Sequence, residues 1–169
     1  MGINDRFFSE TPALAYHKAS LPVVVALTTT QTSQAGASTS DVTGSSLKLR
    51  PEDFKPGTAF RFTMGGTKSG ANAAMIVHIS LAGTQIVSIT ADASTAVEWT
   101  SQITVAAKTM ASQVCIGQLF TDTEDAALEY AAGSVNMKGG GVLKAQIQSQ
   151  HGSDTVTCEF CMIEMLRTP

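Results

Sequence analysis

The chain has 169 residues and a mass of 17.6 kDa, which suits a single domain with a sizeable core. The net charge is −3 and the 11 basic residues are scattered, so the sequence argues against nucleic-acid binding, which requires clustered Lys and Arg. The longest apolar run, residues 21–27, is far shorter than the ~20 residues of a membrane-spanning helix, and the residues before it lack the order of a secretory leader.

Only 15% of the residues are charged, whereas Thr and Ser contribute 21 and 16 residues. Neutral, hydroxyl-rich surfaces of this kind favour a β-rich protein whose exposed faces contact other chains. Synthesis in the cytoplasm is expected, because three cysteines at irregular spacing do not form a disulfide framework.

The N-terminal segment, residues 1 to about 30, is predicted to be an extended arm that begins irregularly and ends as a strand. Its apolar side chains are candidates for an interface with another chain. The candidates in this arm are Phe7, Phe8, Tyr16, Val23, Val24 and Val25.

A linker is predicted to follow over residues 31–56, and it contains most of a Ser/Thr/Gly-rich tract, residues 28–46, without a periodic apolar face. Two interpretations of the tract remain open: it packs on its own domain, or it is held by another chain. The linker ends with Pro51, Pro56 and Gly57, which indicate turns. The predicted organisation is therefore an arm and linker over residues 1–56 and one domain over 57–169.

From residue 58 onward, short apolar or alternating runs recur every 10 to 15 residues or so, separated by Gly, Asn, Asp and Ser. The predicted strands lie near residues 60–62, 75–81, 86–89, 97–105, 114–120, 142–148 and 156–166, with a further candidate at 130–135. A bend or bulge is expected near Thr100, and the helix formers of residues 124–132 indicate one short helical turn. Seven or eight strands predict an all-β jelly-roll β-sandwich. The cysteine and tryptophan spacing of an immunoglobulin domain is missing.

Two glycine-rich segments resemble phosphate-binding loops without meeting their requirements. In residues 64–70, Thr67 rather than Gly precedes Lys68, and the chain continues as a strand instead of a helix. A mobile turn is predicted there, and a simple loop at residues 139–141. No cofactor is expected.

The cysteines at 158 and 161 have the spacing of a redox or zinc motif. Residues three apart on a regular strand point to opposite faces and lie about 10 Å apart, too far for a disulfide. Cys115, Cys158 and Cys161 are therefore interpreted as structural, with a cross-link between subunits as the alternative.

No metal or catalytic site is predicted. His17, His78 and His151 lie in separate segments without the spacing of a metal site, and His78 is expected to be partly exposed on a strand. The acidic residues between 122 and 129 lack the pattern of a calcium loop. Because no catalytic serine, cysteine or carboxylate pattern occurs either, the sequence predicts a protein that is not an enzyme.

The single tryptophan, Trp99, has two interpretations. Its neighbours Val97, Ile103 and Val105 favour a core or interface anchor. Alternatively, Trp99 is a platform for stacking a sugar, in a glycan groove with Tyr130 and Asn136.

Four segments carry a family resemblance: residues 55–62, a proline-glycine entry to a strand, and the strands 86–89, 97–99 and 155–160. Residues 57 to 166 resemble the jelly-roll capsid decoration (cement) proteins of tailed-bacteriophage heads and related head-fibre or tumour-necrosis-factor-like domains. The resemblance implies a virion structural protein that forms a homotrimer, binds the major capsid protein on the head surface and stabilises the shell. It implies no nucleic-acid or membrane partner. A receptor- or carbohydrate-binding module of a head fibre or tail is the alternative.

Overall fold

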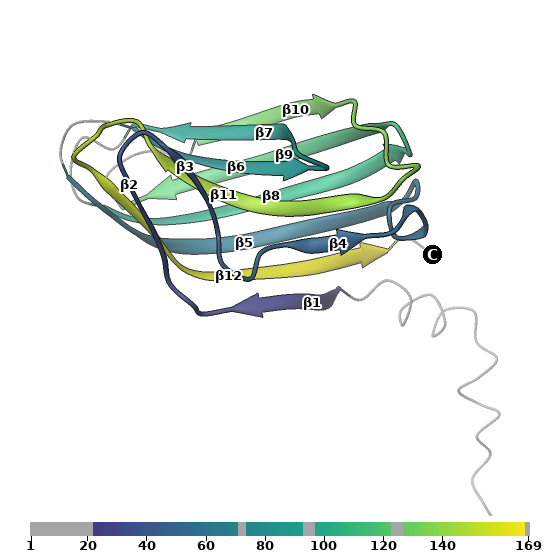
Figure 1. Ribbon diagram of the computed structural model, residues 1–169, viewed down its shortest axis with the longest axis horizontal. Coiled ribbons are helices and arrows are strands. Elements are labelled where there is room, and N and C mark those ends of the chain that lie inside the picture. Colours follow the sequence, from purple (N-terminus) through teal and green to yellow (C-terminus); the bar gives the residue numbers. More distant parts are fainter. Residues whose placement is uncertain (1–21, 71–73, 93–96, 123–126, 168–169) are drawn as a thin grey trace, which may run out of the picture.

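The computed structural model describes residues 22–70, 74–92, 97–122 and 127–167. Its regular structure is almost entirely β-strand, and two antiparallel sheets pack face to face (Figure 1). Sheet A follows the order β1 (Val23–Thr28), β12 (Thr155–Arg167), β5 (Thr58–Ser69), β8 (Val97–Thr109), β9 (Ser112–Thr121) and β10 (Ala127–Gly133), and β2 (Thr32–Ala35) also pairs with β12. Sheet B follows the order β3 (Thr39–Asp41), β11 (Gly141–Ser149), β6 (Met75–Leu81) and β7 (Thr84–Ala91), and β4 (Leu47–Leu49) also pairs with β11.

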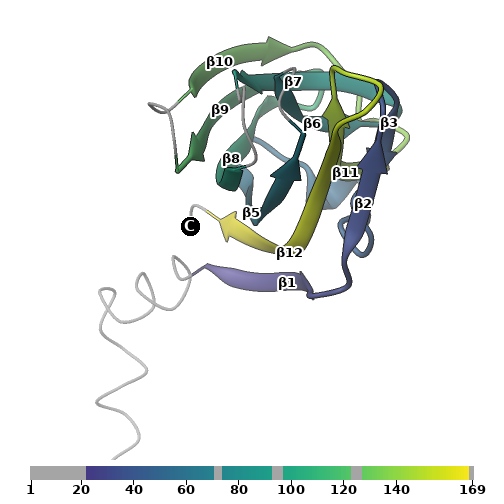
Figure 2. The same cartoon turned by 90° about the vertical axis from the view of Figure 1, so that its left-hand side faces the viewer.

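The chain crosses between the sheets in a wound pattern. β5 and β8 are neighbours in sheet A, whereas β6 and β7, which lie between them in sequence, are neighbours in sheet B. β12 lies beside β5 and β11 beside β6, so each sheet interleaves strands from distant parts of the chain. Figure 2 shows the layers end-on, with sheet A running from β10 through β8 and β5 to β12 and β1. The predicted all-β jelly-roll sandwich is confirmed.

The core lies between the sheets because one side of nearly every long strand is apolar. On β8 the buried residues Trp99, Ile103 and Val105 alternate with exposed or half-exposed ones, as a strand with one face in a core requires. Phe54, in the segment after a short 3-10 helix (Pro51–Asp53), is fully buried and stacks on Phe60 with ring centroids 6.3 Å apart. The segment before β5 therefore contributes to the same core.

The Ser/Thr/Gly-rich tract packs on its own sandwich, which is one of the two interpretations left open by the sequence. The Thr32 hydroxyl donates to Thr43 (2.8 Å), and Ser33 and Thr157 hydroxyls lie 3.0 Å apart. The Ser45 hydroxyl donates to the Ala145 carbonyl and accepts from its amide. Hydroxyl hydrogen bonds, together with the one buried apolar side chain of Val42, thus hold a segment that has few apolar residues.

The predicted boundary at residue 56 falls between strands that pair with the same two partner strands, β11 and β12. β1 and β2 pair with β12, and β3 and β4 pair with β11, so residues on the N-terminal side of the boundary extend both sheets. The division into an arm and a domain stays a prediction about folding units.

Two local predictions are wrong. The segment predicted as a helical turn, residues 124–132, contains β10 from Ala127 onward, because pairing with β9 overrides the helix propensity of Ala, Leu and Glu. Residues 123–126 lie outside the described part. The bulge expected near Thr100 is absent, since β8 pairs regularly with β5 and β9 there, and its register shift lies between Ala107 and Thr109.

Candidate functional site: the outer face of sheet A

The outer face of sheet B has the polarity expected of a surface in water. Its rows hold mainly Thr, Ser, Gln and His together with Asp41, Lys48 and Lys144, and its apolar members are Ile76 and Val142. Asp41 accepts hydrogen bonds from Lys144 (2.6 Å) and Gln146 (2.7 Å), which lower the pKa of its carboxyl. His78 Nε2 lies 3.0 Å from the Gln148 side-chain oxygen. The charged and amide groups of β3 and β11 pair with one another, whereas the buried His78 Nδ1 and Ser80 Oγ of β6 have no hydrogen-bond partner.

The outer face of sheet A is different, because its strands carry apolar residues on the outward side as well as on the side that faces the core. Strand register arranges the outward residues in four rows across the sheet, each named from the β1 or β12 side toward β10. The rows are Leu166, Ala59, Ala106, Val114 and Ala132; Val24, Glu164, Arg61, Thr104, Ile116 and Tyr130; Leu27, Met162, Thr63, Gln102, Gln118 and Leu128; and Phe160, Gly65, Thr100 and Phe120.

Two charges occur in these four rows, and they neutralise each other. Arg61 Nε donates to Glu164 Oε2 at 2.7 Å, and the hydrogen bond from Arg61 to Glu164 raises the pKa of the guanidinium. A paired charge in the middle of a face can be covered by another protein at a lower cost than an unpaired one. These four rows therefore present apolar and neutral polar groups around one internal ion pair, and the next row adds the exposed carboxylate of Glu98 opposite Thr67.

Among the described residues, eight large apolar side chains are exposed, and seven of them belong to sheet A. They form two groups at opposite edges of the sheet. The β1 group consists of Val23, Val24 and Leu27, and the β9–β10 group consists of Ile116, Phe120, Leu128 and Tyr130.

The β9–β10 group is contiguous. Tyr130 lies directly across from Ile116, and Leu128 lies across from Gln118, between Ile116 and Phe120. Leu128 and Tyr130 are 73% and 65% exposed. Contiguous exposed apolar side chains that include an aromatic residue are typical of interaction surfaces.

The structure places three predicted interface residues on this surface or at its edge. Val23 and Val24 are exposed, and Val25 is partly buried at a bulge of β1 and packs against the core. The other candidates of the arm, Phe7, Phe8 and Tyr16, lie outside the described residues.

Trp99 is a core residue and not a surface anchor. Its side chain is 2% exposed, and its indole N–H lies within hydrogen-bonding distance of the Thr67 and Thr157 carbonyl oxygens (3.3 and 3.2 Å). It is therefore available neither to a partner chain nor to a sugar. Tyr130 is exposed in the middle of β10, and Asn136 lies in the loop beyond that strand, so the predicted groove of Trp99, Tyr130 and Asn136 is not assembled.

Cys158 and Cys161 both face the core, contrary to the prediction that they point to opposite faces. A β-bulge between Cys158 and Phe160 inserts one extra residue, so the pleat changes phase and both thiols are buried. Burial raises the pKa of Cys115 and Cys158 to about 11 and that of Cys161 to about 12. All three cysteines are free, and a structural role fits their burial.

The glycine-rich segment, residues 64–70, is mostly strand rather than the predicted mobile turn. Gly65 and Gly66 lie within β5 opposite the bulge of β12, and the Phe160 ring covers Gly65. Lys68 is fully buried, and its ammonium contacts Asp154 Oδ2 and the Gly70 carbonyl, each at 3.0 Å.

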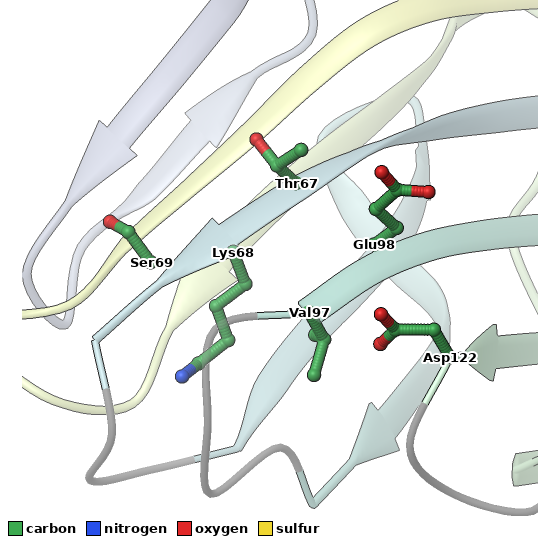
Figure 3. A pocket seen from close by; sticks show the side chains of 6 residues that line it. All are labelled: Thr67, Lys68, Ser69, Val97, Glu98 and Asp122. Carbon is green, nitrogen blue, oxygen red and sulfur yellow. The ribbon is translucent and has the colours of Figure 1, made fainter.

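One end of sheet A carries a shallow pocket of about 340 Å³ (Figure 3). Its lining residues are Thr67, Lys68, Ser69, Val97, Glu98 and Asp122. The Lys68 ammonium is held by Asp154, so the charged groups that face the opening are the exposed carboxylates of Glu98 and Asp122. Two surface carboxylates without a positioned nucleophile or cation give the pocket no evident chemistry.

The histidines and carboxylates of the described residues do not gather into a group of three or more that could hold a metal ion. His78 is 5% exposed, so the expectation of a partly exposed residue is wrong; the Gln148 side chain lies beside its ring, within hydrogen-bonding distance of Nε2. The described part of the chain also contains no helix with the length and hydropathy needed to cross a bilayer.

Sequence reasoning missed the β9–β10 group as a site. A signal was present, because in residues 113–120 apolar side chains occur at both the even and the odd positions. A strand with one solvated face alternates between apolar and polar residues. Apolar residues on both faces of β9 therefore indicated that both faces need cover.

No protein-family model and no curated protein matches the sequence. Among solved structures, the chain is similar to a lectin from Bauhinia forficata in complex with GalNAc (9% identity, TM-score 0.47, covering 88% of this chain and 100% of that one). It is also similar to lectin I-B4 from Griffonia simplicifolia in its metal-free form (10% identity, TM-score 0.39, 94% and 96%). A third similarity is to the CBM2 module of the evolved Dit of Lactobacillus casei BL23 phage J-1 (11% identity, TM-score 0.35, 66% and 63%). Similarities this distant do not bear on the function of the chain.

Proposed function

We propose that this chain is a structural protein that acts by binding and not by catalysis, and that it assembles with copies of itself through the outer face of sheet A. Within this class, we infer a capsid decoration protein that sits as a homotrimer on the head of a tailed bacteriophage and stabilises the shell. The major capsid protein is then its second partner.

The observation that carries the proposal is the difference between the two outer faces. Sheet B presents a surface of mainly polar and charged groups, whereas the four rows of sheet A hold two charges, both within the Arg61–Glu164 pair. Large apolar side chains such as Leu128 stay exposed on sheet A. Water solvates such a face poorly, and association removes it from water.

The capsid part of the proposal rests on the family resemblance and on the N-terminal segment. Phe7, Phe8 and Tyr16 precede β1 in the sequence, and β1 is an edge strand of sheet A. We infer that these side chains contact the capsid or a neighbouring copy. Proteins of this class function in the virion after synthesis in the host cytoplasm.

The first experiment measures the mass of the full chain in solution by light scattering and sedimentation. A mass of three times 17.6 kDa is expected. Monomers over the whole accessible concentration range would contradict self-assembly.

A second experiment tests the location. Heads purified from a phage that encodes the chain are labelled with an antibody and viewed by electron microscopy, and heads from a deletion strain are heated in parallel. Label over the head surface and DNA release at a lower temperature without the protein are expected. Label confined to tails would contradict a decoration role. Full head occupancy by a variant that lacks residues 1–21 would contradict the anchoring role of the arm.

A carbohydrate-binding module remains the second candidate, because one observation favours it. Tyr130 and Phe120 are exposed aromatic side chains on an uncharged part of sheet A, and aromatic faces stack on sugars. A glycan array is expected to show binding that the Tyr130→Ala variant loses. An array without hits would exclude this candidate while leaving the assembly proposal untouched.

A further inference from the structure

We propose that one end of the sandwich, the basic end, docks on an acidic protein surface, with the long axis of the molecule pointing away from that surface. The basic end consists of residues 47–58, 107–112 and 133–141, and it lies at the right of Figure 1, where β4, β8, β10 and β12 end. In the proposed function the acidic surface belongs to the capsid. The inference therefore rests on that function and adds to it the docking surface and the chemistry of the partner.

Backbone contacts bring the segments of the basic end together. The Gly57 amide donates to the Ala107 carbonyl (3.3 Å), and the Met137 amide donates to the Met110 carbonyl (2.7 Å). A Cβ atom at Gly140 would lie 2.7 Å from a carbonyl oxygen at the end of β4. Lysines that are scattered along the sequence therefore gather at one end of the fold.

The basic end has an excess of positive charge. Its carboxylates, Glu52 and Asp53, are both bound by Arg50, at 3.2 and 3.1 Å. Its lysines are all exposed and have no ion-pair partner among the described residues; they are Lys48, Lys55, Lys108 and Lys138. The three segments thus hold five cationic and two anionic side chains, a net charge of +3 in a chain whose net charge is −3.

The opposite end of the sandwich carries exposed carboxylates. Asp92 follows β7, and Glu98 and Asp122 are neighbours, because the Asp122 amide donates to the Glu98 carbonyl (3.1 Å). β8 runs from Glu98 to Lys108 at the basic end, and about ten residues of strand span about 33 Å, several Debye lengths at physiological salt. A molecule with opposite charges at its two ends is oriented by the field of a charged partner.

The position of β1 fits docking through the basic end. Val23, the first residue of β1, lies across from Met165, and Met165 lies across from Phe60 near the start of β5. β1 therefore begins near the basic end, and the proposed anchor within residues 1–21 directly precedes it in the sequence. One end of the molecule thus serves both proposed contacts with the capsid.

An acidic protein surface fits the basic end better than a nucleic acid does. Duplex DNA carries one negative charge per about 1.7 Å of helix axis, and proteins that bind it line a stripe or groove with clustered Lys and Arg. Four lysines on separate segments neutralise few of those charges. Carboxylates spread over a protein surface, in contrast, pair with such lysines one by one.

Binding of the full chain to heads from the deletion strain tests the docking surface. The heads are titrated with fluorescently labelled chain at several NaCl concentrations, and the occupancy gives the dissociation constant. The basic-end variant combines Lys48→Gln, Lys55→Gln, Lys108→Gln and Lys138→Gln. The matched control removes charges at the opposite end and combines Asp92→Asn, Glu98→Gln and Asp122→Asn. All the replaced side chains are exposed, so neither set alters the core.

The wild type is expected to bind the heads less tightly as the salt concentration rises, because salt screens exposed ion pairs. The basic-end variant should bind about tenfold more weakly or worse, the loss expected for four exposed ion pairs, and its binding should depend less on salt. The control should bind at least as tightly as the wild type, with the same dependence on salt.

Equal binding of the wild type and the basic-end variant would overturn this inference and leave the decoration role intact. Weaker binding of the control alone would overturn it as well and assign docking to the opposite end. A wild type that does not bind heads would overturn both the inference and the decoration role.

A titration with a labelled DNA duplex at the same salt concentrations is the second probe. DNA binding tighter than head binding, and lost in the basic-end variant, would overturn the assignment of a protein partner. If circular dichroism shows that the basic-end variant is unfolded, the pairs Lys48→Gln/Lys55→Gln and Lys108→Gln/Lys138→Gln repeat both titrations.

Discussion

At the scale of single residues, the cysteines show how one inserted residue changes a side chain's surroundings. Counting along a regular strand places Cys158 and Cys161 on opposite faces, but the bulge before Phe160 places both in the core. Their chemistry follows from that burial, since a buried thiol is difficult to ionise.

Burial of the thiols predicts low reactivity. Because the pKa values of Cys115, Cys158 and Cys161 are raised to about 11, 11 and 12, a thiol reagent at pH 8 should modify none of them in the native protein. The same reagent should modify all three in denaturant. Rapid modification of the native protein would show that the core opens readily.

The same shifts predict a loss of stability at alkaline pH. Burial in the folded state raises the thiol pKa values above their ordinary value of 9.0, so the thiols of the unfolded chain lose their protons first as the pH rises. The free energy of unfolding should therefore fall between pH 9 and 11, with a contribution of up to ~1.4 kcal/mol per pH unit from each thiol. Urea titrations of the wild type and of Cys161→Ala check this, and the variant should show a smaller decrease.

The buried ion pair of Lys68 and Asp154 predicts a strong single-residue effect. Both side chains are fully buried, so Lys68→Met leaves the Asp154 carboxylate without its cation and should destabilise the fold by ~3–5 kcal/mol. The double variant Lys68→Met/Asp154→Leu should recover part of this loss. Glu52→Gln, in an exposed pair with Arg50, serves as the control and should leave stability nearly unchanged.

At the scale of elements, strand pairing decides features that local sequence does not. β10 has the composition of a helix and is a strand, because β9 offers it a complete ladder of hydrogen bonds. β5 tolerates two consecutive glycines in its middle because β12 bulges opposite them.

The approach of β12 to β5 predicts that Gly66 cannot be replaced. A Cβ atom there would lie 2.0 Å from the Thr157 carbonyl oxygen, so Gly66→Ala must displace the backbone of β12. We expect a loss of about 1–3 kcal/mol in the free energy of unfolding, measured by urea titration. Gly139→Ala is the matched control, since a Cβ at Gly139 meets no atom within 4 Å, and equal stabilities of the two variants would contradict the close approach.

At the scale of the whole molecule, self-assembly links stability to concentration. Only folded copies of the chain associate, so association stabilises the folded state. The melting temperature should therefore rise as the protein concentration rises. Calorimetry over a hundredfold range of concentration measures the shift. Leu128→Glu, which places a charge in the exposed apolar group of sheet A, should abolish this dependence on concentration. Thr90→Glu, on the exposed outer face of sheet B, is the control and should preserve it. A melting temperature of the wild type that does not change with concentration would contradict assembly in this range.

The candidate site was only partly predictable. Val23 and Val24 are predicted interface residues that the structure places at an exposed edge, and Trp99 is a predicted anchor that it places in the core. The apolar run of β1 is visible in the sequence, but the direction in which Trp99 points depends on its partners across the sandwich. The β9–β10 group was missed because its members come from two strands whose register is set by pairing.

The sequence by itself determined the fold class and the neutral character of the surface, because alternation of apolar and polar residues and the frequency of charges are local properties. It also indicated turns, such as the one at Pro56 and Gly57, where Gly57 has a positive φ angle. Only the tertiary structure decided that Cys158 and Cys161 share the core, that Lys68 is paired with Asp154 and that exposed apolar groups gather on one sheet. Each of these features joins residues that are distant in sequence or shifts the pleat by one residue, and strand register, not composition, controls both.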